Sequence, residues 1–212
     1  MRVFGLTGGL ASGKSSVAAH WRSRGLPVID ADALAREVVR PGSPALDELV
    51  AEFGAEILRN GELDRAGLAR LVFGHPEQLR RLEAITHPRI VALREQRLAE
   101  LAAAGEPLVC SEIPLLYEKG LAEALRPIVV VSVPERLQME RARRRDGSSA
   151  AAVLARLGAQ LPLAEKAQRA EYVIDNQGSL ADLQASADQV LLAICRDLGV
   201  PAIRYGLTST EP

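Results

Sequence analysis

Eight residues near the amino terminus have the types and spacing of a phosphate-binding loop. Residues 8–15, GGLASGKS, fit the pattern G-x-x-x-x-G-K-[ST]. Gly8 and Gly13 permit backbone angles that a side chain would forbid, so successive N–H groups can turn towards an anion. In such a loop Lys14 reaches the β- and γ-phosphates of a nucleoside triphosphate, and the Ser15 hydroxyl binds Mg²⁺. Further nucleotide contacts are expected from Gly9, Ala11, Ser12 and Ser16.

Acidic residues follow two apolar runs that read as strands. Asp30 is the last residue of the run at 26–30, and Asp32 follows two positions later. Glu112 is the last residue of the run at 107–112. In an open parallel sheet such positions line the active crevice. Asp32 is therefore a candidate base for an attacking hydroxyl, or the cap of its own helix. Glu112 is a candidate Mg²⁺ ligand, or a structural carboxylate.

Arginines crowd one predicted helix that begins at Pro134. They are Arg136, Arg141, Arg143, Arg144 and Arg145. Arg141 has both Arg144 and Arg145 as neighbours on a helix, so the spacing leaves open which of them meets a nucleotide. Guanidinium groups can neutralise a transferring phosphoryl group beneath a closing lid. A solvated face or a nucleic-acid patch is the alternative, but the net charge of −1 and 3% aromatic residues disfavour nucleic acid.

These residues need an α/β scaffold, which the alternation of strand and helix patterns predicts. A five-stranded parallel sheet is expected from runs at 3–7, 26–30, 107–112, 127–133 and 172–175. Some seventy residues of short helices separate the second and third strands, too many for a simple crossover. Pro76 and Pro88 are each expected to begin one of those helices. We expect an α/β nucleotide-binding core of the P-loop NTPase type (1–31, 105–133 and 165–207), a helical substrate insert (32–104) and an arginine-rich lid (134–164).

Composition sets further limits on the function. The chain has 212 residues, of which 48% are hydrophobic and 25% charged, as expected for a globular protein with a buried core. Only three of its 26 basic residues are lysines, namely Lys14, Lys119 and Lys166. The two cysteines have no metal or redox spacing, no run is long enough to span a membrane, and no signal peptide is recognisable. We therefore expect a cytoplasmic protein with no membrane contact and no obligate protein partner.

The motifs together resemble the dephospho-CoA kinase family. The matching segments, in order, are 5–15, 28–32, 64–65 with Phe73, 87–88, 113–118, the lid positions Gln138, Arg141, Arg145, Arg156 and Gln160, and 174–176 with Gly178. The resemblance implies transfer of the ATP γ-phosphoryl group to the ribose 3′-hydroxyl of dephospho-CoA, with Mg²⁺. It implies that Asp32 is the base, that Arg141 and Arg145 belong to the lid, and that Asn176 lies near the adenine. Substrate contacts are then expected from Asp32, His87, Glu112 and Leu115.

Three departures from the family pattern raise specific questions. Ala11 stands where glycine is usual, which is tolerable if its φ is negative. Glu112 and Glu171 each replace a usual aspartate.

Two other functions compete: a kinase for another nucleoside or sugar hydroxyl, and a nucleotide-dependent switch. A GTPase switch is disfavoured because the sequence has no N-K-x-D motif, and both of its D-x-x-G segments lie outside the position that a switch requires.

Overall fold

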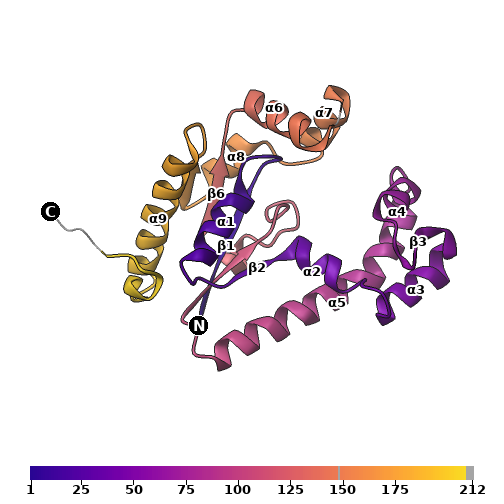
Figure 1. Cartoon of the computed structure of the whole chain (residues 1–212), viewed down its shortest axis with the longest axis horizontal. Helices are drawn as coiled ribbons and strands as arrows, with labels where there is room; N and C mark the ends of the chain where they lie inside the picture. Colours follow the sequence, from indigo (N-terminus) through magenta and orange to yellow (C-terminus); the bar gives the residue numbers. More distant parts are fainter. Residues whose placement is uncertain (148, 209–212) are drawn as a thin grey trace. The chain divides into compact units, whose positions relative to one another are not determined.

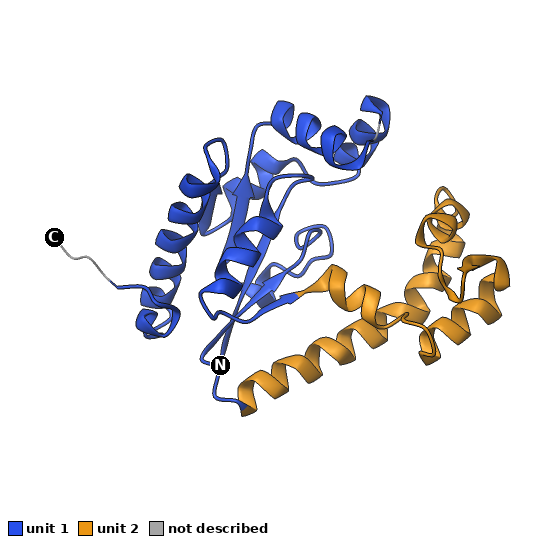
Figure 2. Cartoon of the chain, in the orientation of Figure 1, with its two compact units in different colours: residues 1–29, 104–212 blue, residues 30–103 orange. Residues whose placement is uncertain are grey.

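The computed structural model describes residues 1–147 and 149–208, so residue 148 of the predicted lid lies outside it. The chain forms two compact units, one of residues 1–29 and 104–212 and one of residues 30–103 (Figure 2). The predicted lid region, 134–164, belongs to the first unit. Among the described residues, no helix is both long and apolar enough to cross a membrane.

The first unit is built on a five-stranded sheet. Its strands, in spatial order, are β2 (Val28–Asp30), β5 (Leu108–Glu112), β1 (Arg2–Gly8), β6 (Ile128–Ser132) and β7 (Tyr172–Asp175). β1 runs parallel to β5 and β6, and β6 runs parallel to β7. The three central strands, β5, β1 and β6, are mostly apolar and buried, as in sheets covered on both faces. The predicted α/β fold with five strands is confirmed.

In the described part of this unit, five α-helices accompany the sheet (Figure 1). They are α1 (Lys14–Ser23), α6 (Glu135–Asp146), α7 (Ala150–Gly158), α8 (Leu163–Arg169) and α9 (Leu180–Asp197). α1 packs against α9, where the Trp21 indole N–H donates to the Ala187 carbonyl at 3.0 Å. α8 packs on β6. The sequence patterns did not predict α8, because it is only seven residues long and follows Pro162 without a capping side chain.

The second unit is mostly helical, with its own apolar core. It holds α2 (Ala31–Glu37), α3 (Pro44–Phe53), α4 (Arg65–Val72), α5 (Pro76–Ala103) and the short strands β3 (Leu58–Arg59) and β4 (Glu62–Leu63). Side chains of Asp30, Ser43 and Asp64 cap α2, α3 and α4. The β3–β4 hairpin was not predicted. Its turn residues Asn60 and Gly61 both have positive φ, which suits a two-residue hairpin loop.

The expectation that Pro88 begins a new helix is wrong. α5 runs without a break from Pro76 to Ala103 and holds Pro88 in its interior. Proline removes the N–H that would bond the Ala84 carbonyl. Both Ala84 and Pro88 are exposed, so water can satisfy that carbonyl. Side chains strengthen the adjacent turns, where Thr86 Oγ1 donates to the Leu82 carbonyl at 2.8 Å and Arg89 Nη1 to the Ile85 carbonyl at 2.6 Å.

Candidate active site

The loop between β1 and α1 has the geometry of an anion cradle. Gly13, at the start of α1, has a φ of +96°, and a Cβ there would lie 2.1 Å from Asn176 Nδ2. A Cβ on Gly8 would lie 2.5 Å from Ser12 Oγ. Neither position therefore accepts a side chain. The loop leads directly into the amino terminus of α1, whose free N–H groups and partial positive charge favour an anion.

Ala11 has a φ of +53°, so the condition under which alanine is easily tolerated at this position, a negative φ, is not met. A left-handed conformation costs a residue with a Cβ about 1–2 kcal/mol. Asn60 is the only other non-glycine residue with positive φ in the described part of the chain, and asparagine adopts that conformation more readily. The loop thus holds Ala11 in a conformation that alanine alone disfavours, and local backbone strain of this kind is concentrated at functional sites.

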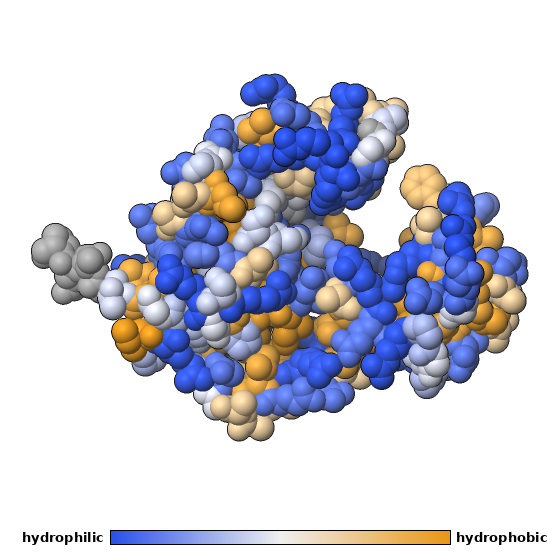
Figure 3. Space-filling view, in the orientation of Figure 1, coloured by the Kyte–Doolittle hydropathy of each residue, from blue (hydrophilic) through white to orange (hydrophobic). Residues whose placement is uncertain are grey.

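A cavity of about 520 Å³ lies over this loop. Its lining consists of Gly9, residues 11–16, Arg141, Arg144 and Arg145. The phosphate-loop residues and the arginine-rich helix, more than a hundred positions apart in sequence, therefore share one space. Figure 3 shows the surface formed by α6 as strongly hydrophilic. Arg144, one of the neighbours that the helical spacing left open, joins Arg141 and Arg145 in the lining.

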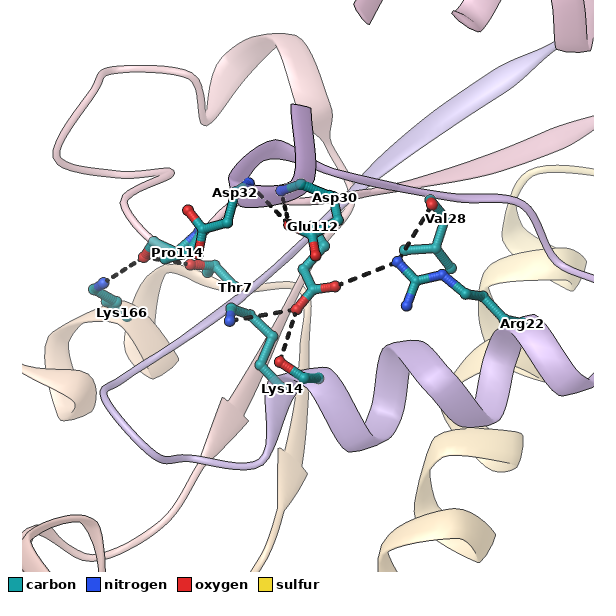
Figure 4. A network of polar contacts seen from close by, with 11 residues as sticks. Thr7, Lys14, Arg22, Val28, Asp30, Asp32, Glu112, Pro114 and Lys166 are labelled. Atoms are coloured by element: carbon teal, nitrogen blue, oxygen red, sulfur yellow. Dashed lines mark hydrogen bonds and ion pairs between the residues drawn. The ribbon is translucent and has the colours of Figure 1, made fainter. Parts of the chain in front are cut away.

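Glu112, at the carboxyl end of β5, connects the loop to α1 (Figure 4). Its side chain is buried, and Oε1 lies 3.4 Å from Lys14 Nζ and accepts from Ser15 Oγ at 3.3 Å. Arg22 approaches the other oxygen, Oε2, at 3.7 Å, and also donates to the Val28 carbonyl at 3.4 Å. Oε2 has no hydrogen-bond partner among the described atoms. One buried carboxylate thus contacts the side chains of both Lys14 and Ser15.

Asn176 ties the loop after β7 to the phosphate loop. Its Nδ2 donates to the Ser12 carbonyl at 2.7 Å, and its own carbonyl accepts from Arg141 at 3.0 Å. The residue is buried, and its backbone N–H bonds Ser132. The resemblance to the kinase family pointed to Asn176 for its nearness to adenine. The contacts that support Ser12 and Arg141 were not foreseen, because they depend on tertiary pairing of β6 and β7.

The arginines of the predicted lid differ in their partners. Arg145 and Arg156 both pair with Asp146, at 2.7 and 2.6 Å. The hydrogen bond from Arg145, followed by that from Arg156, holds the pKa of Asp146 far below its usual range. The same hydrogen bond raises the pKa of Arg145. Arg145 therefore lines the cavity while its guanidinium group is paired with the Asp146 carboxylate. Arg141 is instead bonded to a neutral carbonyl.

The segment after β5 is held by a residue that the motifs did not include. The Pro114 carbonyl accepts from Thr7 Oγ1 at 3.1 Å and from Lys166 Nζ at 3.2 Å. Lys166 is fully buried and pairs with Glu118 at 2.7 Å. Burial by itself would raise the pKa of Glu118, but the hydrogen bond from Lys166 helps to lower it. Leu115 is half-buried beside this anchor. The rarity of lysine in this chain was the one signal for Lys166.

Asp32 and His87, two other predicted site residues, belong to the second unit. Asp32 lies in the first turn of α2, two residues after β2 ends at Asp30. The cap of this helix is Asp30, whose Oδ1 accepts from the N–H groups of Asp32 and Ala33 at 2.8 and 3.1 Å. The alternative that Asp32 caps its own helix is therefore wrong. His87 lies exposed on α5.

Comparisons with known proteins agree on one family. A family model described as dephospho-CoA kinase matches residues 2–182. A dephospho-CoA kinase of Anaeromyxobacter dehalogenans is 50% identical over 97% of this chain and 100% of its own length. Among solved structures, a Thermus thermophilus protein is similar with a TM-score of 0.79 at 44% identity, covering 91% of this chain and 97% of that one. A dephospho-CoA kinase from Campylobacter jejuni has a TM-score of 0.67 at 30% identity, covering 92% and 97%. The chain belongs to the dephospho-CoA kinase family.

Proposed function

We propose that this chain transfers the γ-phosphoryl group of ATP to the ribose 3′-hydroxyl of dephospho-CoA, giving coenzyme A and ADP, the last step of coenzyme A synthesis. Membership of the dephospho-CoA kinase family supports the overall reaction. The observation that carries the chemistry is the cavity shared by the phosphate loop and the lid arginines. Such a cavity can hold a triphosphate and exclude water from it.

The phosphate loop binds the donor through backbone N–H groups and Lys14. Lys14 Nζ lies 3.4 Å from Glu112 Oε1, so the ammonium group is desolvated on one side. When ATP binds, Lys14 turns from this carboxylate to the β- and γ-phosphates. Arg141 and Arg144 neutralise charge on the phosphoryl group during its transfer. Asn176 bonds both Arg141 and the Ser12 carbonyl, and so fixes the position of Arg141 relative to the loop.

Residues of the site fit a magnesium ion that accompanies ATP. Ser15 Oγ and Glu112 Oε1 lie 3.3 Å apart, and Mg²⁺ prefers oxygen ligands of these types. The buried Oε2 of Glu112 accepts no hydrogen bond from the described atoms, so this oxygen is available to interact with a cation. Ser15 would hold the ion directly, and Glu112 would hold it directly or through water. The bound ion would neutralise the β- and γ-phosphate oxygens.

Asp32 is the base that accepts the proton of the attacking hydroxyl. Its place two residues after the carboxyl end of β2 is typical of catalytic residues in open α/β sheets. Because Asp30 supplies the helix cap, the carboxylate of Asp32 is not needed for that task. Within the second unit, no described residue donates a hydrogen bond to it. A carboxylate in this state can orient a ribose hydroxyl and take its proton.

The test is a coupled assay and a product analysis. The purified protein is mixed with ATP, Mg²⁺ and dephospho-CoA, and mass spectrometry follows the gain of one phosphoryl group on the 3′-oxygen. Asp32→Asn should retain ATP binding and fold while turnover falls at least ~10²-fold, the low end for a general base. Folded, ATP-binding protein that leaves dephospho-CoA unchanged but phosphorylates another nucleoside or sugar would overturn the choice of acceptor.

A second variant separates the lid from the acceptor site. Arg141→Ala should lower kcat more than it raises the KM for dephospho-CoA, because Arg141 lines the cavity over the phosphate loop. The opposite pattern would assign Arg141 to binding of the acceptor.

A further inference from the structure

One arginine outside the predicted lid reaches the buried carboxylate of the phosphate site. Arg22 lies in the last turn of α1, and its Nη2 comes within 3.7 Å of Glu112 Oε2 (Figure 4). The same Nη2 donates to the Val28 carbonyl at 3.4 Å, which holds the guanidinium group in this place. The side chains of Arg22 and Glu112 are 42% and 4% exposed, so an arginine at the surface approaches a buried charge. The proposed reaction gives this arginine no role.

The two oxygens of Glu112 face different cations. Oε1 lies 3.4 Å from Lys14 Nζ and accepts from Ser15 Oγ at 3.3 Å. Oε2 is buried and accepts no hydrogen bond from the described atoms, and it is this oxygen that Arg22 approaches. Ser15 and Arg22 are seven residues apart, so they share a face of α1, and both reach this carboxylate. The charge of one buried carboxylate is thus shared between Lys14 and Arg22.

The positive charge of Arg22 makes Lys14 easier to detach from Glu112. A second cation beside the carboxylate repels the Lys14 ammonium group, and this repulsion opposes the attraction of Glu112 for Lys14. The same cation offsets part of the negative charge that an incoming phosphate group meets at Glu112. Salt screens these interactions only in part, because the carboxylate is buried. Both effects favour the state in which Lys14 has left Glu112 and binds phosphate.

We propose that Arg22 is a positioning residue for the phosphate loop, which shares the Glu112 carboxylate with Lys14 and so allows Lys14 to move to the phosphates of ATP. The inference rests on the proposed function, since it takes Lys14 as the group that binds the β- and γ-phosphates. Arg22 acts on Lys14 through Glu112 rather than through contact with a substrate. Its effect on ATP binding should therefore vanish when residue 112 carries no charge.

The experiment measures the affinity of the full chain for ATP in a chelating buffer, by titration calorimetry. Arg22→Gln removes the charge and should weaken binding about 5-fold, the upper end for a half-exposed ion pair. Arg22→Lys keeps the charge and should bind ATP within about 2-fold of the unchanged protein. In a Glu112→Gln background, Arg22→Gln should change the affinity by less than about 2-fold, because the charge through which it acts is gone.

The matched control is Arg24→Gln, at the carboxyl-terminal cap of the same helix. Arg24 pairs with Asp188 of α9, so this variant should bind ATP like the unchanged protein. Circular dichroism checks that every variant is folded. Unchanged affinity of Arg22→Gln would overturn the proposal, and so would an equal loss of affinity in the Glu112→Gln background, which indicates a merely structural role. Failure of the proposed function looks different, because the unchanged protein would then make no coenzyme A from dephospho-CoA.

Discussion

Replacing Glu112 by glutamine tests whether this carboxylate competes with phosphate for Lys14. The Lys14 ammonium and the Glu112 carboxylate lie 3.4 Å apart, with side chains 13% and 4% exposed. At an effective dielectric constant of about 20, Coulomb's law gives roughly 5 kcal/mol for such a pair. Desolvation and side-chain ordering offset most of it, and close ion pairs of this kind retain a net value of about 1–2 kcal/mol.

ATP without a metal must overcome this pairing, and its phosphates also face the negative charge of Glu112. Glu112→Gln removes both obstacles while keeping the size of the side chain. We therefore expect magnesium-free ATP to bind about 10-fold more tightly to the variant, which corresponds to about 1.4 kcal/mol. Turnover with Mg²⁺ should fall, because an amide is a poorer ligand for this ion than a carboxylate. Calorimetric titration with ATP in a chelating buffer measures the first effect, and steady-state kinetics measures the second.

The control is Glu118→Gln. Glu118 also pairs with a lysine, Lys166, at 2.7 Å, but it lies outside the lining of the phosphate cavity. This variant should lose stability and keep its affinity for ATP. Unchanged or weaker binding of magnesium-free ATP to Glu112→Gln would refute the competition between carboxylate and phosphate, whatever happens to turnover.

Three other perturbations address the fold around the site. Ala11→Gly should raise the free energy of unfolding by up to about 1 kcal/mol, because relief of the positive φ exceeds the added flexibility of the unfolded chain; a loss of stability in urea unfolding would contradict this. Lys166→Met should lower the free energy of unfolding by about 3 kcal/mol, since it leaves Glu118 without its cation, and a change below about 1 kcal/mol would show that the ion pair adds nothing. Burial is the main cause that raises the pKa of each tyrosine, and it raises the pKa to about 12 for two of them. The stability that the protonated tyrosines contribute is therefore complete below pH 10 and is lost as the pH rises towards 12. Tyrosinate absorbance should therefore appear at higher pH in the native than in the urea-unfolded protein, and coincident curves would contradict the burial. The tyrosines concerned are Tyr117, Tyr172 and Tyr205.

Residue patterns within a short stretch of sequence predicted those helices and strands that are stabilised by contacts between sequence neighbours. The strand, glycine loop and helix around Lys14 follow from apolar residues, backbone freedom and a helix start within some twenty residues of one another. The start of α3 at Pro44 has a local cause as well, because the Ser43 side chain accepts from the N–H of Leu46. In each case the residues that decide the conformation are neighbours in the sequence.

Other features depend on residues far apart in the sequence, and these were missed or wrong. The φ of Ala11 is positive although alanine itself disfavours that conformation, so the residue type does not reveal it. α5 continues through Pro88 because packing along the rest of a long helix outweighs one lost hydrogen bond. The support that Asn176 gives to Ser12 spans more than 160 positions. Membership of a family pointed to Asn176, but only the fold shows which atoms it holds.

The distribution of lysine in this chain has a physical explanation at two of its three positions. Arginine is the usual basic residue here, and its planar, rigid fork suits exposed pairs such as those with Asp146. In the proposed reaction Lys14 leaves one anion for another in a narrow loop, which a compact ammonium group on a flexible stem can do. Lys166 is fully buried and must reach a carbonyl and a carboxylate at once, at 3.2 and 2.7 Å. A guanidinium group would bring five N–H donors into a space that offers two acceptors, and the unsatisfied donors would be costly to bury. Lysine is therefore retained where the cation must move or must be enclosed.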